Sequence, residues 1–472
     1  MGSGKVTDWQ GKHVTVAGLG VSGIPAAKAL HARGASVTVV NDGDDARARE
    51  QAAELEALGV TVRLGDGATL PEGTELVVTA PGWKPDKPLF AAARAAGLEI
   101  WGDVELAWRL RGPDAAPWLA ITGTNGKTTT TQMLASILKA AGLRTAAVGN
   151  IGVSLLDAVL GDEQYDVLAV ELSSYQLHWA PSLRAHSAAV LNLAPDHLDW
   201  HGSMEAYAAD KGRIYEGNRV ACVYNVADKA TEDLVREADV EEGCRAVGFT
   251  LGAPGPSQLG VVDGILVDRA FVENRHKNAQ ELAEISDVNP PAPHNIANAL
   301  AAAALARAFG VPPKAVRDGL RAFTPDAHRI AHVADVDGVA YVDDSKATNT
   351  HAAEASLAAY ESIVWIAGGL AKGASFDELV AKSAKRLRAV VLIGADRALI
   401  REALARHAPE VPVVDLDRTD TGAMLQAVTE AKRLAQPGDT VLLAPACASM
   451  DMFTNYNKRG DAFAEAVREL GS

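Results

Sequence analysis

The chain has 472 residues, and its 48% hydrophobic and 22% charged residues are close to the averages of soluble globular proteins. That composition excludes wholesale disorder and a fibrous architecture, and the length exceeds what one hydrophobic core serves, so several domains are expected. A formal net charge of −15 gives no positive field for a polyphosphate backbone, so we expect no nucleic-acid partner.

From residue 13 the sequence alternates short β-branched runs with alanine-rich helical runs, which is the rhythm of a parallel sheet. The first strand, HVTVAG, leads into Gly18-Leu-Gly20-Val-Ser-Gly23, and the next strand ends at Asp42. Such a GxGxxG turn lets a diphosphate approach the backbone. NAD and a UDP-linked substrate both satisfy these contacts, and the motif alone leaves the two open.

The strongest motif is GTNGKTTTT, from Gly123 to Thr131, which lies between the strand WLAIT and an amphipathic helix. In such a loop, backbone N–H groups hold an anion, Lys127 neutralises the β- and γ-phosphates, and the Thr128 hydroxyl reaches Mg²⁺. The general spacing is GxxxxGK[ST], but position 121 is Ile, so the loop matches only in a shortened form. We predict a nucleotide phosphate cradle rather than a turn with a surface lysine.

Acidic and imidazole groups follow the next two apolar strands, DVLAVEL and AAVLNLA. Glu171 ends the first strand, and Asp196, His197 and Asp199 follow the second. Open parallel sheets bind ligands at the carboxyl ends of their strands. Mg²⁺ prefers oxygen ligands, so Glu171 suits it, and a neutral His197 would complete the shell of a second metal.

A helix expected from about Met204 to Tyr215 places Lys211 within an apolar stripe. Burial would lower the pKa of this lysine and leave a neutral amine that can add CO₂ and form a carbamate able to bridge metals. The alternative is a packed stem whose ammonium reaches solvent, and the lysine by itself favours that reading.

The rest of the chain divides into a weakly patterned stretch and a third α/β region. Residues 250–293 predict irregular or short antiparallel pieces, followed by an alanine-rich helix from about Asn295 to Phe309. Five apolar strands then alternate with helices, and two turns, VDDSKATNT and APACASMDMF, form anion-binding corners. The fold class predicted is α/β with three domains. They are a Rossmann-like domain over 1–113, a P-loop-type central ATPase domain over 114–325 and a Rossmann-like C-terminal domain over 326–472.

Taken together, these motifs resemble the Mur ligases, the family that builds bacterial cell-wall precursors, over essentially the whole chain. GTNGKTTT is shared with all Mur ligases and with folylpolyglutamate synthases, as is a lysine similar to Lys211 that the family carbamylates. Five further segments resemble the member that adds D-glutamate: GNIG (149–152), ELSSYQL (171–177), DHLD (196–199), DDSKATN (343–349) and PACASMDMF (445–453).

The resemblance implies an ATP-dependent amide ligase that joins D-glutamate to UDP-N-acetylmuramoyl-L-alanine, using ATP, two Mg²⁺ ions and a carbamylated Lys211. The catalytic residues implied are Lys127, Glu171, His197 and Lys211, and the metal ligands implied are Thr128, Glu171, His197 and Lys211. The ATP contacts implied are Gly123, Thr124, Asn125, Gly126, Lys127, Thr128, Thr129, Asn295, Arg329 and Asp344. The contacts implied for the UDP-linked substrate are Gly20, Val21, Ser22, Asp42, Pro81, Gly82, Asn150 and His197. Those implied for D-glutamate are Lys346, Thr348, Lys372, Ser449 and Tyr456.

Two positions depart from the family pattern. The family often has a Glu two positions after the arginine that corresponds to Arg329, where this chain has Ala331, and Tyr456 stands where Phe is familiar. Backbone contacts near the glutamate site would survive the second change.

Four alternatives account for fewer of the motifs. A folylpolyglutamate synthase would not need about 110 residues before its phosphate loop, and an NAD dehydrogenase would leave GTNGKTTT without a role. A non-enzymatic ATP-binding switch does not explain the presence of Lys211 together with Glu171 and His197. Another Mur ligase, one that adds diaminopimelate, lysine or alanine, is excluded only by the third-domain motifs.

The compartment follows from what the sequence lacks. Its three cysteines have no metal-type spacing, its N-terminus has no signal-peptide core, and it has no long apolar run. We expect a cytoplasmic monomer without a membrane partner.

Overall fold

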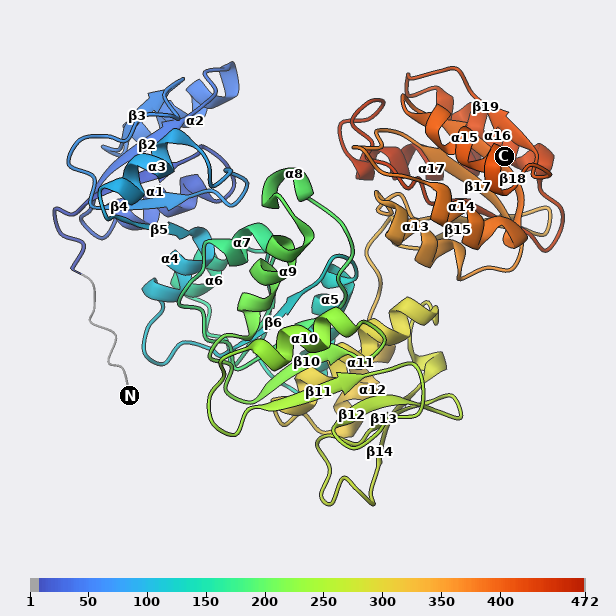
Figure 1. The fold of residues 1–472 in the computed structure, drawn as a ribbon, viewed down its shortest axis with the longest axis horizontal. Coiled ribbons are helices and arrows are strands. Elements are labelled where there is room, and N and C mark those ends of the chain that lie inside the picture. The colour runs from blue at the N-terminus through green and yellow to red at the C-terminus, as the bar shows by residue number, and fades with distance from the viewer. Residues whose placement is uncertain (1–7, 471–472) are drawn as a thin grey trace. The chain divides into compact units, whose positions relative to one another are not determined.

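The computed structural model describes residues 8–470 and contains three β-sheets covered by helices, so the predicted three-domain α/β fold is confirmed (Figure 1). Backbone contacts divide the chain into two units. The first unit runs to residue 288 and also includes 297–323, and the second comprises 289–296 and the chain from 324 onward. Within the described range, no helix is both long and apolar enough to cross a membrane.

The N-terminal sheet has five parallel strands in the order β3-β2-β1-β4-β5. Strand β1 therefore lies between β2 and β4, where the strand order changes direction, and sheets of this kind bind ligands beyond the carboxyl ends at that point. The strands are β1 (His13–Ala17), β2 (Ser36–Asn41), β3 (Thr61–Leu64), β4 (Leu76–Thr79) and β5 (Glu99–Gly102). The helices are α1 (Gly23–His31), α2 (Ala46–Glu56), α3 (Pro88–Ala95) and α4 (Asp103–Leu110).

The central sheet has nine strands in the order β14-β13-β12-β11-β10-β9-β6-β8-β7. Its parallel part is built from β6 (Trp118–Thr122), β7 (Ala147–Gly149), β8 (Leu168–Glu171), β9 (Ser187–Val190), β10 (Ala221–Asn225) and β11 (Arg245–Phe249). Its edge is built from β12 (Gln258–Val262), β13 (Ile265–Asp268) and β14 (Gln280–Glu284). Because β13 runs antiparallel to both of its neighbours, the antiparallel pieces predicted between 250 and 293 are confirmed.

Helices of the central domain bury apolar faces against this sheet. The face of α5 that carries Met133, Leu134, Ile137 and Leu138 is fully buried, as its spacing predicts. Gly319 on α12 packs against it so closely that a Cβ there would lie 2.4 Å from the Ile137 Cα. The helices are α5 (Lys127–Ala140), α6 (Leu155–Leu160), α7 (Ser174–His178), α8 (Leu198–His201), α9 (Met204–Gly212), α10 (Lys229–Glu237), α11 (Pro293–Ala308) and α12 (Pro313–Ala322).

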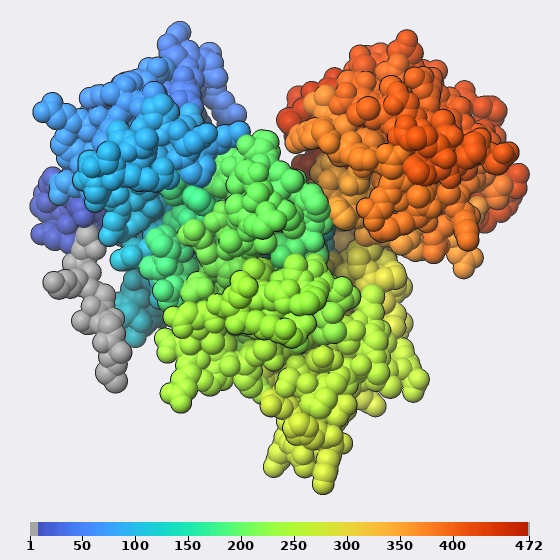
Figure 2. All heavy atoms as spheres, viewed as in Figure 1, coloured from blue at the N-terminus to red at the C-terminus, as the bar shows by residue number. Residues whose placement is uncertain are grey.

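The C-terminal sheet has six strands in the order β15-β16-β20-β17-β18-β19, and only β15 is antiparallel to its neighbour. Side chains of β17 alternate between two cores, with Trp365 in one and Ile366 in the other, so this strand is covered on both faces. Figure 2 shows the C-terminal part of the chain, orange to red, gathered into one body. The strands are β15 (Ala331–Val336), β16 (Val339–Asp343), β17 (Ile363–Gly368), β18 (Leu387–Ile393), β19 (Val413–Asp415) and β20 (Thr440–Leu443). The helices are α13 (Thr350–Leu357), α14 (Asp377–Ser383), α15 (Arg397–His407), α16 (Ala423–Leu434) and α17 (Tyr456–Leu470).

Candidate active site

The polar groups predicted in the central domain follow neighbouring strands of its sheet. Strand β6 lies between β9 and β8, and β7 pairs with β8 on the far side. The loop from Gly123 follows β6, Glu171 ends β8, and His197 comes after β9. Asn150 follows β7. Because parallel strands end at the same edge of the sheet, one edge carries all four features.

The phosphate loop uses glycine at two positions where a side chain does not fit. Gly123 has a φ of +154° and Gly126 a φ of +82°, a region that other residues rarely adopt. A Cβ on Gly126 would lie 2.4 Å from Oδ1 of Asn298 on α11. The loop can therefore turn tightly into α5, which begins at Lys127 and presents its N-terminus to the loop.

Lys127 folds back over the loop that it follows. Its Nζ donates to the carbonyl oxygen of Gly123 at 2.9 Å and to that of Thr124 at 3.0 Å. Both carbonyls belong to the loop itself, so the ammonium group is held where the loop would receive a phosphate. This placement suits a cation that neutralises negative charge.

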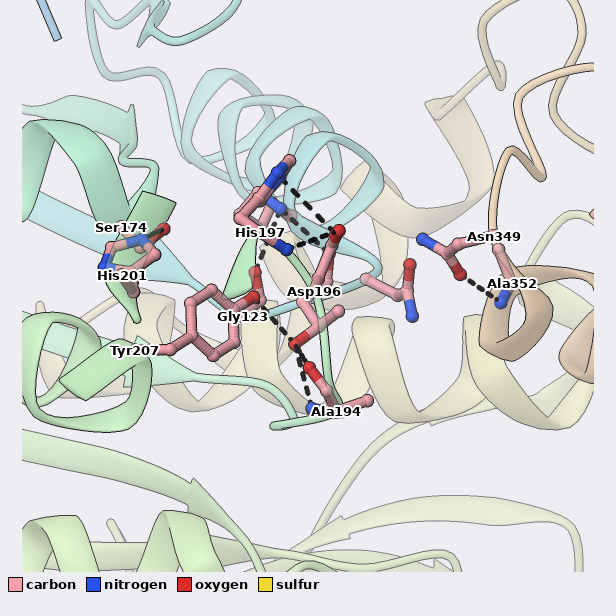
Figure 3. Close-up of polar contacts among 12 residues, drawn as sticks. Gly123, Ser174, Ala194, Asp196, His197, His201, Tyr207, Asn349 and Ala352 are labelled. Atoms are coloured by element: carbon pink, nitrogen blue, oxygen red, sulfur yellow. Dashed lines mark hydrogen bonds and ion pairs between the residues drawn. The ribbon is translucent and has the colours of Figure 1, made fainter. Parts of the chain in front are cut away.

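Neighbouring elements hold the loop in shape through contacts that the sequence motifs did not reveal. The Thr124 hydroxyl lies 3.0 Å from the Tyr207 hydroxyl and accepts from the Ala194 backbone N–H at 3.0 Å (Figure 3). Asn192 accepts from the Asn125 N–H at 2.8 Å and donates to the Asn125 carbonyl at 3.0 Å. The strand-end position of Asn192 and the apolar stripe of α9, which includes Tyr207, are signals that could have indicated these two residues.

Glu171 is a buried carboxylate with one unpaired oxygen. The residue is 1% exposed, and its Oε1 accepts from the Asn150 amide at 2.9 Å. Its Oε2 has no hydrogen-bond partner among residues 8–470. An unpaired buried carboxylate oxygen is costly unless a cation or a donor reaches it, so Glu171 fits the predicted role of a Mg²⁺ ligand.

His197 stands at the start of the four-residue helix α8 with a φ of +54°. Its Nε2 lies 3.5 Å from an Asp196 oxygen, and Figure 3 shows the two side chains together. Burial lowers the pKa of His197, and the nearby Lys127 and Lys211 act in the same direction while Asp196 opposes them. A neutral imidazole can accept a proton or bind a metal.

Lys211 is buried beside the phosphate loop. The residue is 1% exposed, and its Nζ donates to the Gly123 carbonyl at 2.8 Å and lies 3.4 Å from the Thr122 hydroxyl. The alternative in which its ammonium reaches solvent is therefore wrong. Burial lowers the pKa of Lys211 well below its usual value, and Lys127 adds to that effect. The side chain thus has the environment of a nucleophilic amine.

The predicted metal ligands include only two residues of the types that most often bind metals, Glu171 and His197. The described part of the chain contains no group of three or more His, Cys, Asp or Glu residues arranged to hold a metal ion. A carbamate on Lys211 and the Thr128 hydroxyl would supply the remaining protein oxygens.

Six of the eight residues predicted to bind the UDP-linked substrate follow adjacent strands of the N-terminal sheet, whereas Asn150 and His197 follow strands of the central sheet. Several of the six make hydrogen bonds or ion pairs within the protein. Ser22 donates to Asp103 at 2.9 Å, and Asp42 pairs with Lys87 at 2.5 Å. The Gly82 carbonyl accepts from the Trp200 indole at 3.2 Å, which ties this turn to α8. Val21 is 94% exposed at the tip of the Gly-rich turn. The GxGxxG motif did not indicate Asp103 or Lys87, the partners of Ser22 and Asp42.

The C-terminal residues predicted for D-glutamate stand in loops after three adjacent strands. Lys346 and Thr348 follow β16, Lys372 follows β17, and Ser449 follows β20. The Lys346 Nζ lies 4.0 Å from the ring centre of Tyr456, the first residue of α17. The Leu370 and Ala448 backbones bond to each other in both directions, which joins the last two loops.

Arg459 is a residue of this region that sequence reasoning missed. It is 1% exposed, and its guanidinium donates to the Ser345 hydroxyl at 3.0 Å, the Ser345 carbonyl at 2.8 Å and the Cys447 carbonyl at 3.1 Å. It thereby fixes the loops that carry Lys346 and Ser449 to each other. Arg459 lies in the first turn of α17, and the other buried residues of that helix are apolar or glycine. The sequence pattern therefore did not indicate that this arginine joins two loops.

Three residues outside the phosphate loop are predicted to contact ATP, and two of them, Arg329 and Asp344, lie close together in the C-terminal unit. Burial raises the pKa of Asp344 to about 6, and the charge of Arg329 acts against that shift. The backbone N–H of Ile330, next to Arg329, donates to Asp344 at 3.3 Å. Asn295 lies near the start of α11, and its amide donates to the Pro290 carbonyl at 3.3 Å.

Comparison with known families and proteins gives matches along the whole chain. Residues 12–102 match the family described as "Mur ligase MurD-like, N-terminal domain", 121–306 the "Mur ligase middle domain" and 328–447 the "Mur ligase, glutamate ligase domain". Among curated proteins, a UDP-N-acetylmuramoylalanine--D-glutamate ligase of Streptomyces avermitilis is 88% identical over 99% of this chain and 100% of that protein. A protein of the same name from Thermobifida fusca is 60% identical over 98% of this chain and 99% of that protein.

Solved structures with lower identity share the fold. MurF from Acinetobacter baumannii matches with a TM-score of 0.59 at 18% identity, over 91% of this chain and 90% of that one. A MurF ligase from Thermotoga maritima in complex with ADP matches with a TM-score of 0.57 at 15% identity, over 99% and 97%.

Proposed function

The chain belongs to the Mur ligase family, and on that premise we propose that it joins D-glutamate to UDP-N-acetylmuramoyl-L-alanine at the expense of ATP, in peptidoglycan precursor synthesis. The observation that carries this proposal is the 88% identity to D-glutamate ligases over 99% of the chain. The site supports it, because the loop after β6 is a phosphate cradle and the loops after β16, β17 and β20 gather cationic and hydroxyl groups.

The first step is the attack of the L-alanyl carboxylate on the γ-phosphorus of ATP. An oxygen–phosphorus bond forms, the bond to the β-phosphate oxygen breaks, and ADP leaves. Negative charge spreads over the transferred phosphoryl oxygens, and Lys127, held over the loop by the Gly123 and Thr124 carbonyls, stabilises it. The product is an acyl phosphate.

The second step is the attack of the D-glutamate amine on the acyl carbonyl. Lys346, Thr348, Lys372 and Ser449 hold the carboxylates of the amino acid, and Tyr456 packs its ring against Lys346. The amine must lose a proton as the tetrahedral intermediate collapses to the amide and phosphate. His197, whose pKa is lowered by burial, or a nearby carboxylate accepts that proton.

Mg²⁺ would serve as the metal cofactor of this reaction, and its charge would stabilise the phosphate oxygens of ATP. We propose two ions, held by Thr128, Glu171, His197 and a carbamate on Lys211. The carbamate forms when the neutral Lys211 nitrogen attacks the carbon of CO₂ and releases a proton to water. The unpaired Glu171 Oε2 supports the cation site, and the burial of Lys211 supports the neutral amine.

The remaining assignments belong to the same proposal. ATP is bound by the loop from Gly123 to Thr129 with Asn295, Arg329 and Asp344, and the UDP-linked substrate by the N-terminal sheet with Asn150 and His197. We place the domains at 1–113, 114–325 and 326–472, and we propose that the protein is a cytoplasmic monomer.

The test is ADP release from ATP by the purified full-length protein with UDP-N-acetylmuramoyl-L-alanine and one amino acid at a time. We expect turnover with D-glutamate and less than about one hundredth of it with L-glutamate, D-alanine, L-lysine or diaminopimelate, since a site built for specific polar contacts rejects poor matches strongly. Turnover with one of the others and none with D-glutamate would refute the assignment.

A further inference from the structure

A buried chain of hydrogen bonds links helices α7, α8 and α9 beside the phosphate loop. The His201 side chain is 0% exposed, with Nδ1 2.9 Å from Asp210 Oδ2 and Nε2 3.0 Å from Ser174 Oγ. His178 Nδ1 lies 2.9 Å from both oxygens of the same carboxylate, and Arg213 Nε lies 3.2 Å from its Oδ1. Figure 3 shows His201 turned toward Ser174.

Each link of the chain stands close in sequence to a residue proposed to act in the reaction. Ser174 begins α7 just after Glu171, His201 ends the helix that starts after His197, and Asp210 directly precedes Lys211. None of the three linking residues was among the site residues predicted from the sequence. The hydrogen bonds therefore connect α9, which carries Lys211, with α7 and α8, which follow Glu171 and His197 in the sequence.

The order Ser174, His201, Asp210 matches that of a hydrolytic triad, but burial excludes that use. Ser174 is 2% exposed and the His201 side chain is fully buried. A nucleophile must contact its substrate, and a hydroxyl enclosed in this way does not. The bonds instead satisfy buried polar groups and fix their orientation.

Helix α8 needs such an anchor more than its neighbours do. It has only four residues, and within the described range the His197 side chain makes no capping hydrogen bond to it. One helical turn is not stable by itself in water. The two bonds of His201, together with the Tyr175 ring stacked on it at 5.5 Å and 3°, hold the end of α8 against α7 and α9.

We infer that His201 and Asp210 are positioning residues for the ligation. They hold His197 and Lys211 in register with Glu171 through the buried bonds among α7, α8 and α9. This inference rests on the proposed function, because it takes the roles of those three residues from it. Displacement of a reacting or binding group by about 1 Å can reduce a rate about 100-fold, so loosening the chain lowers turnover without removing any group that touches substrate.

The test compares four variants of the full-length protein, Asp210→Asn, His201→Ala, His201→Asn and the control Ala209→Asn. Ala209 precedes Asp210 on α9 but is exposed, so an asparagine at this position leaves the buried hydrogen bonds of Asp210 intact. For Asp210→Asn and His201→Ala we expect kcat to fall at least about tenfold and the half-saturating Mg²⁺ concentration to rise several-fold. The KM for D-glutamate stays unchanged. His201→Asn recovers part of the loss, because its amide can donate to Asp210, and Ala209→Asn behaves like the unmodified protein.

Two results would overturn the inference. One is a folded Asp210→Asn protein with unchanged kcat and Mg²⁺ dependence. The other is a lower melting temperature in all three chain variants with full turnover per folded molecule, as a purely structural role requires. If His201→Ala does not fold, the isosteric Asp210→Asn decides. If the unmodified protein does not release ADP with D-glutamate, the proposed function is refuted instead. The same variants are then compared by calorimetry, which measures how their binding of ADP depends on Mg²⁺.

Discussion

The Nζ of Lys211 lies 2.8 Å from the carbonyl oxygen of Gly123, so a fully buried amine contacts the first residue of the phosphate loop. The amine reaches this position because Lys211 and Tyr207 share the inner face of α9, and Tyr207 also bonds to the loop through Thr124. The neighbour of the phosphate loop is thus a lysine whose pKa burial has lowered.

Replacement of Lys211 by Ala should abolish most activity, and short carboxylic acids should restore part of it. The deletion leaves space beside Gly123 for a small carboxylate that stands in for the carbamate. Turnover of Lys211→Ala would be measured with and without formate or acetate, with Lys229→Ala on α10 as the control. Full activity of Lys211→Ala without added acid would contradict the carbamate.

Lys127→Ala should lower kcat by about 100-fold or more, because it removes the cation that we propose to face the transferred phosphoryl group. Lys127 Nζ donates to the Gly123 and Thr124 carbonyls of the loop, and we expect the melting temperature to change less than kcat does. Lys139→Ala, at the exposed end of the same helix, is the matched control. Equal turnover of the two variants would rule out the assigned role of Lys127.

Gly126→Ala should weaken ATP binding and destabilise the loop. Gly142→Ala should lower the stability of the protein only by the backbone strain at that position and leave ATP binding unchanged. Both glycines have similar φ, +82° and +79°, which costs other residues about 1–2 kcal/mol. The Cβ at 126 would meet Asn298 at 2.4 Å, but a Cβ at 142 meets nothing described within 4 Å. Calorimetric titration with ATP and thermal unfolding measure the two effects, and indistinguishable ATP affinities would speak against the cradle.

Tyr456→Phe should leave the KM for D-glutamate nearly unchanged, while Tyr456→Ala should raise it about tenfold. The contact with Lys346, 4.0 Å from the ring centre, uses the ring and not the hydroxyl, and such contacts are worth about 0.5–2 kcal/mol. Steady-state kinetics with varied D-glutamate checks this. An equal rise in KM for both variants would mean that the hydroxyl, not the ring, matters.

Asp344→Asn should stabilise the C-terminal unit increasingly as pH rises from 4.5 to 7.5. Burial raises the folded-state pKa of Asp344 to about 6 from the ordinary 3.8. Between these values the folded state holds a proton that the unfolded state has lost, so stability falls as pH rises, by up to about 3 kcal/mol. Urea unfolding at both pH values tests this, and a stability difference between variant and unmodified protein that does not change with pH would contradict it.

The sequence predicts much of the fold because its signals are local. Buried parallel strands such as WLAIT and SIVWIAG are continuous apolar runs, and turns such as GTNGKT follow them directly. Short exposed strands such as β3, where burial alternates only weakly, carry no such signal and were not predicted.

The contacts that hold the site together could not be predicted in the same way. His201 and Asp210 come from different helices, and Arg459 lies more than 100 positions from Ser345. Nothing in the local pattern marks a polar residue as buried when its partner is supplied by the fold. Motifs therefore indicated the groups that face a ligand, whereas the residues that position them became visible only in three dimensions.

The central claim is that a substrate carboxylate is phosphorylated and then joined to D-glutamate. It is tested most directly with UDP-N-acetylmuramoyl-L-alanine in which both oxygens of the alanyl carboxylate are ¹⁸O. During turnover with ATP and D-glutamate, the phosphate released should contain one ¹⁸O atom per molecule, seen by mass spectrometry, because the acyl carbon–oxygen bond breaks when the amine attacks. Phosphate without ¹⁸O, formed together with the amide product, would contradict the acyl-phosphate route.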